Sequence, residues 1–136
     1  EHNNKKESVA LKNAGNELYK KKDFTGALSK YDEAISKDPK NMTFHSNKAA
    51  VHFANKDWDA VMTCCAEGME VGKANYAPYL DRAKSLTRWG KALQKKGDMG
   101  GAIDKLKEAQ LEEFQKDTER LLKTWELEKR KADKLA

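Results

Sequence analysis

The feature that most constrains this sequence is an internal repeat of 34 residues. Similar four-residue strings, each with aspartate in third place, occur at 21–24, 55–58 and 96–99. The first two aspartates are 34 residues apart and the last two are 41 apart. One 34-residue unit therefore occurs three times, with seven additional residues between the second and third copies. A period in this range is the signature of a repeat architecture, in which each unit buries its apolar face against its neighbours.

Each unit is predicted to form two amphipathic helices. In the first unit, an apolar stripe at helical spacing ends in three lysines, which suit the negative end of the helix dipole. Asp23 is a good N-cap for the following helix, and Pro39 ends that helix. Asp57 and Asp98 are predicted to repeat this capping in the later units.

Small residues recur with the same step as the aspartates. They are Gly15, Ala49 and Gly90, and, later in each unit, Ala34, Gly68 and Ala109. A glycine inside a helix costs about 1 kcal/mol relative to alanine. Their recurrence predicts a close approach of backbones where the two helices of a unit cross.

The seven inserted residues lie around Gly72–Leu80 and are compatible with either a loop or a longer helix. Pro78 suits a first helical turn, where its missing N–H costs nothing. The first helix of the third unit is therefore predicted to start near Asn75–Pro78 and to run to Lys96.

The two ends of the chain differ in pattern. Apolar residues continue at helical spacing after Leu111 as far as Leu135, which predicts a seventh helix covering the apolar face of the last repeat. A helix projecting into a longer parent chain is the alternative. Residues 1–6 have no apolar period and are expected to fray.

Composition excludes several classes of function. No apolar run approaches the roughly 18 residues of a membrane span, and no charged-then-apolar leader opens the chain. The adjacent Cys64 and Cys65 are poorly placed for a disulfide, which favours two reduced thiols in a cytosolic protein. No phosphate loop, activated nucleophile or Cys/His ligand set is present, so we predict no enzyme, no cofactor and no metal.

A helix–turn–helix period of 34 residues identifies the tetratricopeptide repeat (TPR). The first copy fits its pattern at Leu11, Gly15, Ala27, Tyr31, Ala34 and Pro39. We therefore predict an all-α, right-handed superhelical solenoid of three tetratricopeptide repeats plus a C-terminal capping helix. It would be a single TPR domain over 1–136, with repeats at about 8–41, 42–75 and 83–116 and a final helix at about 117–135.

In such a stack the first helix of each pair lines a groove. Lys12 and Asn16 are four residues apart on the first of these helices, and Lys84 and Arg88 have the same spacing on the third. Asn47 lies on the helix between them. Cations and amides converging in a groove suit a short anionic peptide, because several donors can meet a terminal carboxylate.

These five residues match the carboxylate clamp of chaperone-binding TPR domains, which hold the C-terminal Glu-Glu-Val-Asp tail of the chaperones Hsp70 and Hsp90. The stretches 15–24, 41–43 and 71–79 resemble the middle, Hsp90-binding TPR domain of the Hop (Hsp70/Hsp90-organising, stress-inducible) co-chaperone family. The resemblance implies a cytoplasmic, monomeric module that tethers the Hsp90 C-terminal tail, with the Hsp70 tail as a secondary partner.

The resemblance also assigns lesser roles. It implies that Tyr19 packs on apolar side chains of the peptide and that Thr43 makes a lesser contact in the peptide groove. Ala54, His45 and His52 depart from the family pattern, which leaves selectivity between the two chaperones open. Tyr19 and Phe53 are equally suited to packing within a hairpin.

Some alternatives remain at this stage. Preferential docking of the Hsp70 tail, or binding of an unrelated acidic peptide, would use the same groove. Nucleic-acid binding would use the basic runs at 20–22 and 129–131, but a net charge of +5 is modest for that function, and solvated helix ends explain both runs better. The tryptophans Trp58, Trp89 and Trp125 are predicted to be packing residues.

Overall fold

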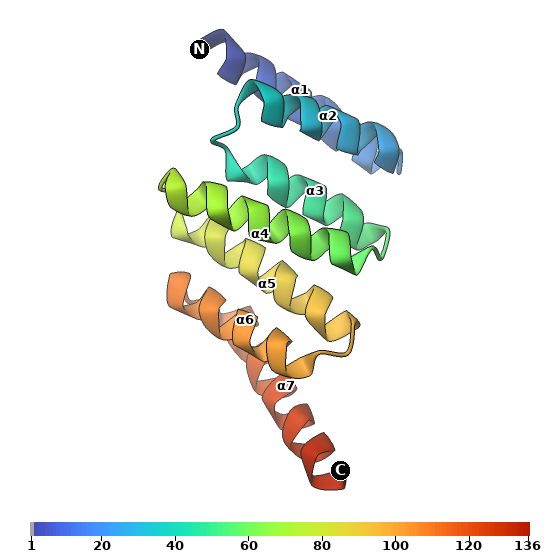
Figure 1. The fold of residues 1–136 in the computed structure, drawn as a ribbon, viewed down its shortest axis with the longest axis vertical. Coiled ribbons are helices and arrows are strands. Elements are labelled where there is room, and N and C mark those ends of the chain that lie inside the picture. The colour runs from blue at the N-terminus through green and yellow to red at the C-terminus, as the bar shows by residue number, and fades with distance from the viewer. Residues whose placement is uncertain (1) are drawn as a thin grey trace. The chain divides into compact units, whose positions relative to one another are not determined.

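The protein is all α-helical over the residues that the structure describes, 2–136. The computed structural model contains seven helices joined by short connections (Figure 1). In chain order they are α1 (His2–Lys20), α2 (Phe24–Lys37), α3 (Met42–Ala54), α4 (Trp58–Ala74), α5 (Tyr79–Lys95), α6 (Met99–Glu112) and α7 (Lys116–Leu135). The predicted all-α architecture of three helix pairs and a final helix is therefore confirmed.

The chain divides into two compact units, an N-terminal unit that ends at Ala77 and a C-terminal unit that begins at Pro78. The hairpins α1–α2 and α3–α4 form the N-terminal unit, in which α2 also packs against α3. The hairpin α5–α6 and helix α7 form the C-terminal unit. A single domain over 1–136 and a right-handed superhelix stay predictions.

Helix α1 begins earlier than its apolar pattern indicates. Residues 2–6, which were expected to fray, form its first turns, so that expectation was wrong there; Glu1 lies outside the described residues. Directly after these residues, the Lys37 ammonium of α2 lies 2.9 Å from the Glu7 carboxylate. This contact holds the start of α1 against the end of α2.

The three predicted N-caps are present. The side chains of Asp23, Asp57 and Asp98 each accept a hydrogen bond from the backbone N–H three residues on, at 3.0, 3.3 and 2.9 Å. Each bond satisfies a donor that the first turn of a helix would leave unpaired. The local sequence thus fixes where α2, α4 and α6 begin.

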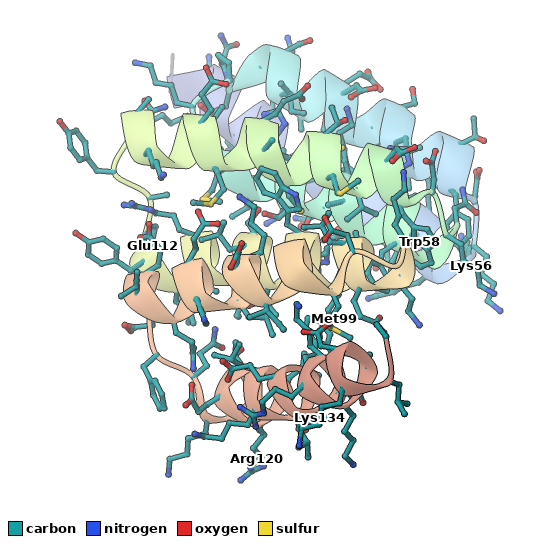
Figure 2. All side chains as sticks on the ribbon, turned by 60° about the horizontal axis from the view of Figure 1, so that its bottom comes forward. Lys56, Trp58, Met99, Glu112, Arg120 and Lys134 are labelled. Atoms are coloured by element: carbon teal, nitrogen blue, oxygen red, sulfur yellow. The ribbon has the colours of Figure 1, made fainter. Side chains whose placement is uncertain are left out.

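The turns inside the three hairpins share the same backbone conformation. Lys22, Lys56 and Gly97 occupy equivalent positions and all have positive φ, at 64°, 59° and 90°. In each turn the aspartate that follows donates its N–H to the carbonyl five residues back, at 2.9 Å. This is the closure by which a left-handed residue ends a helix. Figure 2 labels Lys56 of the second turn and Trp58, with which α4 begins.

The seven inserted residues are helical. Helix α4 ends at Ala74, three residues beyond the position equivalent to the end of α2, and α5 begins at Tyr79, four residues before the position equivalent to the start of α3. Four-residue connections, 38–41 and 75–78, remain on both sides of the second hairpin. The insertion therefore adds about two helical turns in all and no loop, and Pro78 stands immediately before α5 as its N-cap.

The glycines at the hairpin crossings allow the predicted close approach. A Cβ atom on Gly15 would lie 2.6 Å from a ring carbon of Tyr31, and one on Gly90 would lie 3.1 Å from the carbonyl oxygen of Ala102. No side chain larger than hydrogen fits at Gly15 unless the tyrosine ring moves.

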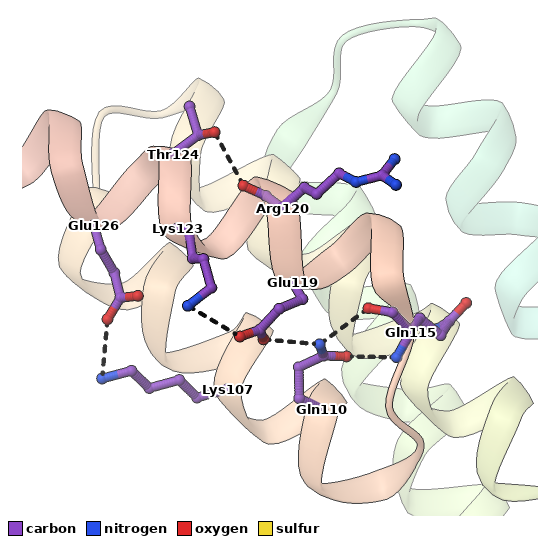
Figure 3. Close-up of polar contacts among 8 residues, drawn as sticks. All are labelled: Lys107, Gln110, Gln115, Glu119, Arg120, Lys123, Thr124 and Glu126. Atoms are coloured by element: carbon purple, nitrogen blue, oxygen red, sulfur yellow. Dashed lines mark hydrogen bonds and ion pairs between the residues drawn. The ribbon is translucent and has the colours of Figure 1, made fainter.

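Helix α7 covers α6, as predicted. Leu122 and Trp125 of α7 form one buried cluster with Ala102, Ile103 and Leu106 of α6. At the connection, Gln110 donates to the Gln115 carbonyl and to the Glu119 carboxylate, both at 3.1 Å, and accepts the Gln115 N–H at 3.0 Å (Figure 3). These bonds fix the direction in which α7 leaves α6.

Candidate functional site

The first three predicted site residues share one face of α1. Lys12, Asn16 and Tyr19 are spaced by four and three residues, and all three are half-buried. Gly15 lies on the buried face that packs against α2. The helix thus presents a lysine, an amide and a phenol beside its packed stripe.

The Asn16 amide is held by a residue of the neighbouring helix. The Tyr31 hydroxyl of α2 donates to Asn16 Oδ1 at 2.5 Å. Tyr31 is only 2% exposed, and burial, with a smaller contribution from Tyr19, raises its pKa, so the hydroxyl keeps its proton. With Oδ1 engaged, the two N–H donors of the amide are left for another partner.

Sequence reasoning missed this role of Tyr31, which it placed only within the repeat pattern. The signal that could have revealed it is a polar residue directly after the small residue at a hairpin crossing. A tyrosine that packs on Gly15 brings its hydroxyl to the position next to that glycine, which is Asn16.

Helix α3 carries the second group. Thr43 and Asn47 are four residues apart and half-buried. The Thr43 side chain is used locally, because its hydroxyl donates to the Asn41 carboxamide oxygen at 2.6 Å, and its N–H donates to the same atom at 3.0 Å. Asn47 makes no side-chain hydrogen bond within residues 2–136, so its amide is available to a ligand.

Helix α5 carries the remaining pair, and both residues belong to the C-terminal unit. Lys84 is exposed and Arg88 is half-buried, whereas Ala83, Leu86 and Gly90 form the buried face of the helix. Lys84 has no ion-pair partner in the part of the chain that the structure describes. The five predicted clamp residues are therefore divided between the units, three and two, and their convergence stays a prediction.

One departure from the family pattern, His45, has a structural setting. His45 is 7% exposed and lies at a cleft of about 380 Å³ with Glu67 and Glu70 of α4. Its Nδ1 is 3.7 Å from Glu67 Oε2. Burial lowers the pKa of His45, Glu67 partly opposes that shift, Lys48 adds to it, and Asp32 opposes it. Nothing in the structure explains His52 or Ala54.

Aromatic residues at the hairpin turns pack on one another. Tyr19 and Phe24 have ring centroids 5.8 Å apart, and Phe53 meets Trp58 edge-on at 4.9 Å. Packing within a hairpin therefore accounts for Phe53, and Tyr19 belongs to the same kind of contact. A peptide contact for Tyr19 stays a prediction.

The other tryptophans are packing residues, as predicted. The Lys105 ammonium lies 3.8 Å from the centre of the Trp89 ring, and Trp125 is buried between α6 and α7. Cys64 and Cys65 are buried free thiols, and burial raises the pKa of Cys64, which disfavours its thiolate.

Within residues 2–136, no group of three or more histidine, cysteine or acidic side chains could hold a metal ion. Among those residues, no helix is both long enough and apolar enough to cross a membrane.

Comparisons with known sequences agree on one family. A family model described as TPR repeat matches residues 15–56. Stress-induced-phosphoprotein 1 of Caenorhabditis elegans is 41% identical over 131 residues, which are 95% of this chain and 40% of that protein. The Hsp70-Hsp90 organising protein of Plasmodium falciparum is 35% identical over 124 residues, 90% of this chain and 22% of that protein. The chain thus spans well under half the length of these relatives.

Solved structures give the same result. The N-terminal domain of stress-induced protein-1 (STI-1) from C. elegans superposes with a TM-score of 0.87 at 36% identity, covering 90% of this chain and 97% of that domain. The TPR2AB domain of yeast Sti1, solved in a complex with pHSP90, gives a TM-score of 0.88 at 27% identity, over 93% of this chain and 48% of that one. The chain therefore belongs to the TPR domains of the STI1 (Hsp70–Hsp90 organising) co-chaperone family, which are non-catalytic protein-binding modules.

Proposed function

We propose that this domain binds the acidic C-terminal tail of a chaperone, ending in Glu-Glu-Val-Asp, through a carboxylate clamp. The clamp residues are Lys12, Asn16, Asn47, Lys84 and Arg88. One observation carries the proposal: each of the five lies on the first helix of a hairpin. The chain that holds them matches 97% of the length of the N-terminal STI-1 domain of C. elegans. The relatives named as Hsp70–Hsp90 organising proteins and the yeast Sti1 complex with pHSP90 support it.

Each residue type has a distinct part in this mechanism. Lys12, Asn16 and Asn47 would donate to the terminal carboxylate from two helices of the N-terminal unit. Lys84 and Arg88 would meet an acidic side chain further back in the peptide. Charge-assisted hydrogen bonds contribute about 1.5–3 kcal/mol each, and ordering a flexible tail offsets part of that sum. An affinity on the order of micromolar follows.

The Hsp90 tail is the proposed preferred partner. Support comes from the stretches 15–24, 41–43 and 71–79, which resemble the middle, Hsp90-docking domain of the family. Docking of the Hsp70 tail is the alternative, because both tails share the terminal residues that the clamp would read. In either case the domain acts by tethering, in the cytoplasm and as a monomer, without changing a covalent bond.

Calorimetry with four peptides tests the proposal. The peptides are Ser-Arg-Met-Glu-Glu-Val-Asp from Hsp90, Ser-Gly-Pro-Thr-Ile-Glu-Glu-Val-Asp from Hsp70, and the C-terminally amidated form of each. We expect micromolar binding of the free Hsp90 tail and at least tenfold weaker binding of its amide, since amidation removes the terminal charge. Equal affinity for the free and amidated forms would rule out the clamp, and tighter binding of the Hsp70 tail would reverse the proposed preference.

A further inference from the structure

One side-chain hydrogen bond in the N-terminal unit joins its first two helices. Tyr31 of α2 donates its hydroxyl to Asn16 Oδ1 of α1 at 2.5 Å, across 15 residues of sequence. Both groups belong to the first hairpin. A buried hydroxyl needs a partner, and this amide oxygen is the one that the structure provides.

The contact depends on Gly15. The Tyr31 ring lies where a Cβ on Gly15 would be, with three ring atoms within about 3.1 Å of that position. The ring can therefore lie close against α1 and bring its hydroxyl to the next residue, Asn16. Tyr31 also packs with Ala27 and Val51 in the core of the unit, which leaves the ring little freedom to move.

The direction of this hydrogen bond fixes the direction of the amide. An asparagine side chain has one acceptor end and one donor end, and rotation by half a turn exchanges them. A phenol that donates to Oδ1 holds the acceptor end inward and turns both N–H groups outward. A carboxylate accepts hydrogen bonds only, so the other orientation would present it with a repulsive oxygen.

We propose that Tyr31 is a positioning residue for the clamp, which holds the Asn16 amide with its donors facing the terminal carboxylate of the bound tail. The inference rests on the proposed function of the groove. Tyr31 itself does not touch the peptide in this mechanism. It acts by disfavouring the orientation of Asn16 that cannot bind, because in that orientation the buried Tyr31 hydroxyl would lose its acceptor. Less order then has to be imposed when the tail arrives.

A double-mutant cycle tests the inference. Tyr31→Phe removes one oxygen and keeps the ring that packs on Gly15. We expect it to weaken binding of the free Hsp90 tail by about three- to tenfold and to leave binding of the amidated tail unchanged. In the Asn16→Ala background, Tyr31→Phe should have no further effect. Tyr76→Phe is the matched control, because Tyr76 is 91% exposed and its hydroxyl lies away from the hairpin core.

The outcomes separate this inference from the proposed function. If the wild-type protein does not distinguish the free from the amidated tail, the clamp itself fails. Suppose that the wild type distinguishes the two tails. If Tyr31→Phe distinguishes them equally well, or if it lowers the affinity for both tails by the same factor, the positioning role is overturned while the clamp stands. An effect of Tyr31→Phe that persists in the Asn16→Ala background overturns it too.

A measurement without peptide tests the inference even if the clamp does not bind the tail or Tyr31→Phe lowers the stability of the fold. The Asn16 side-chain NH2 signals in a 1H–15N spectrum report how the amide is held. We expect Tyr31→Phe to shift these signals and speed rotation of the NH2 group, at a temperature where circular dichroism shows both proteins folded. Unchanged Asn16 signals would overturn the inference whatever the peptides do.

Discussion

The first and third hairpins are built on the same plan and carry different contents. In both, a glycine of the first helix lets the second helix approach: Gly15 receives the Tyr31 ring, and Gly90 approaches the Ala102 carbonyl and Leu106. Tyr31 and Leu106 are equivalent in the repeat. The first hairpin places a hydroxyl on Asn16, one of the proposed clamp residues, whereas the third places an apolar side chain in the core shared with α7. One repeat position can thus hold a polar residue of the neighbouring helix or extend an apolar core, depending on whether its side chain ends in a polar atom.

The largest effect on stability should come from truncating the side chain at this position in the third hairpin. Leu106→Ala removes a fully buried side chain from the cluster shared by α6 and α7, and should cost about 2–5 kcal/mol of unfolding free energy. Urea denaturation measures it. Leu111→Ala, at a position that is 88% exposed on the same helix, is the control and should change stability by less than about 0.5 kcal/mol. Equal effects of the two changes would contradict the α6–α7 core.

Adding a methyl group at each of the two crossing glycines should lower stability in both hairpins but lower tail binding only in the first. Gly15→Ala and Gly90→Ala both crowd a packed contact and should each cost about 1–3 kcal/mol of stability. Only Gly15→Ala displaces Tyr31 from Asn16, so it alone should also weaken binding of the free tail. Loss of binding with Gly90→Ala at a temperature where it is folded would show that the distinction is wrong.

Removing a clamp lysine from the third hairpin should affect binding and spare the fold. We expect Lys84→Ala to cost about 1–3 kcal/mol of binding free energy, read by calorimetry, with helicity unchanged by circular dichroism. Lys95→Ala removes an equal charge from the last turn of the same helix and is the control. Similar losses with both variants would point to a general effect of charge in place of a clamp. Raising the salt concentration should also weaken the wild-type complex.

The hairpin turns offer a smaller test. Lys22 and Gly97 occupy the same left-handed position, which disfavours side chains by about 1–2 kcal/mol. Gly97→Ala should therefore destabilise the C-terminal unit by about 1 kcal/mol. Lys22→Gly should leave the N-terminal unit equally stable or slightly more so, as thermal melts would show. A destabilising Lys22→Gly would mean that the lysine side chain contributes more than its backbone strain costs.

The smallest expected effect is on the pH dependence of stability. It should differ between the two units, since all three histidines precede residue 78. The pKa of His45 is lowered in the folded state, so protonation favours unfolding. Its contribution to stability is fully present above its ordinary value of 6.5 and is lost as pH falls from there through the folded pKa. Hydrogen exchange between pH 7 and pH 5 should show α3 and α4 loosening more in the wild type than in His45→Gln. An identical pH dependence in the two proteins would exclude His45 as the cause.

The elements of this fold could be predicted because their signals are local. Asp23, Asp57 and Asp98 start helices through bonds that span three residues, and the apolar stripes need only helical spacing. The insertion was left open between loop and helix, because no local signal tells whether extra residues lengthen a helix or separate two. Fraying of residues 2–6 is predicted because they carry no apolar period, yet these residues continue α1.

The candidate site was predictable only as a set of residues. Lys12 and Asn16, and likewise Lys84 and Arg88, share a face by spacing alone. The roles of their neighbours were not predictable in this way. Thr43 completes the cap of α3, and His45 is buried beside Glu67, because packing between helices decides which side chains reach one another.

The sequence by itself determined the repeat, the helices, their caps and the residue types available to a ligand, because these depend on interactions within about four residues. Only the tertiary structure decided that Tyr31 reaches Asn16, that Arg82 pairs with Glu112 at 3.0 Å, and that Trp125 is enclosed by α6 and α7. Such contacts depend on the distance between helix axes, and that distance follows from the sizes of side chains far apart in the chain.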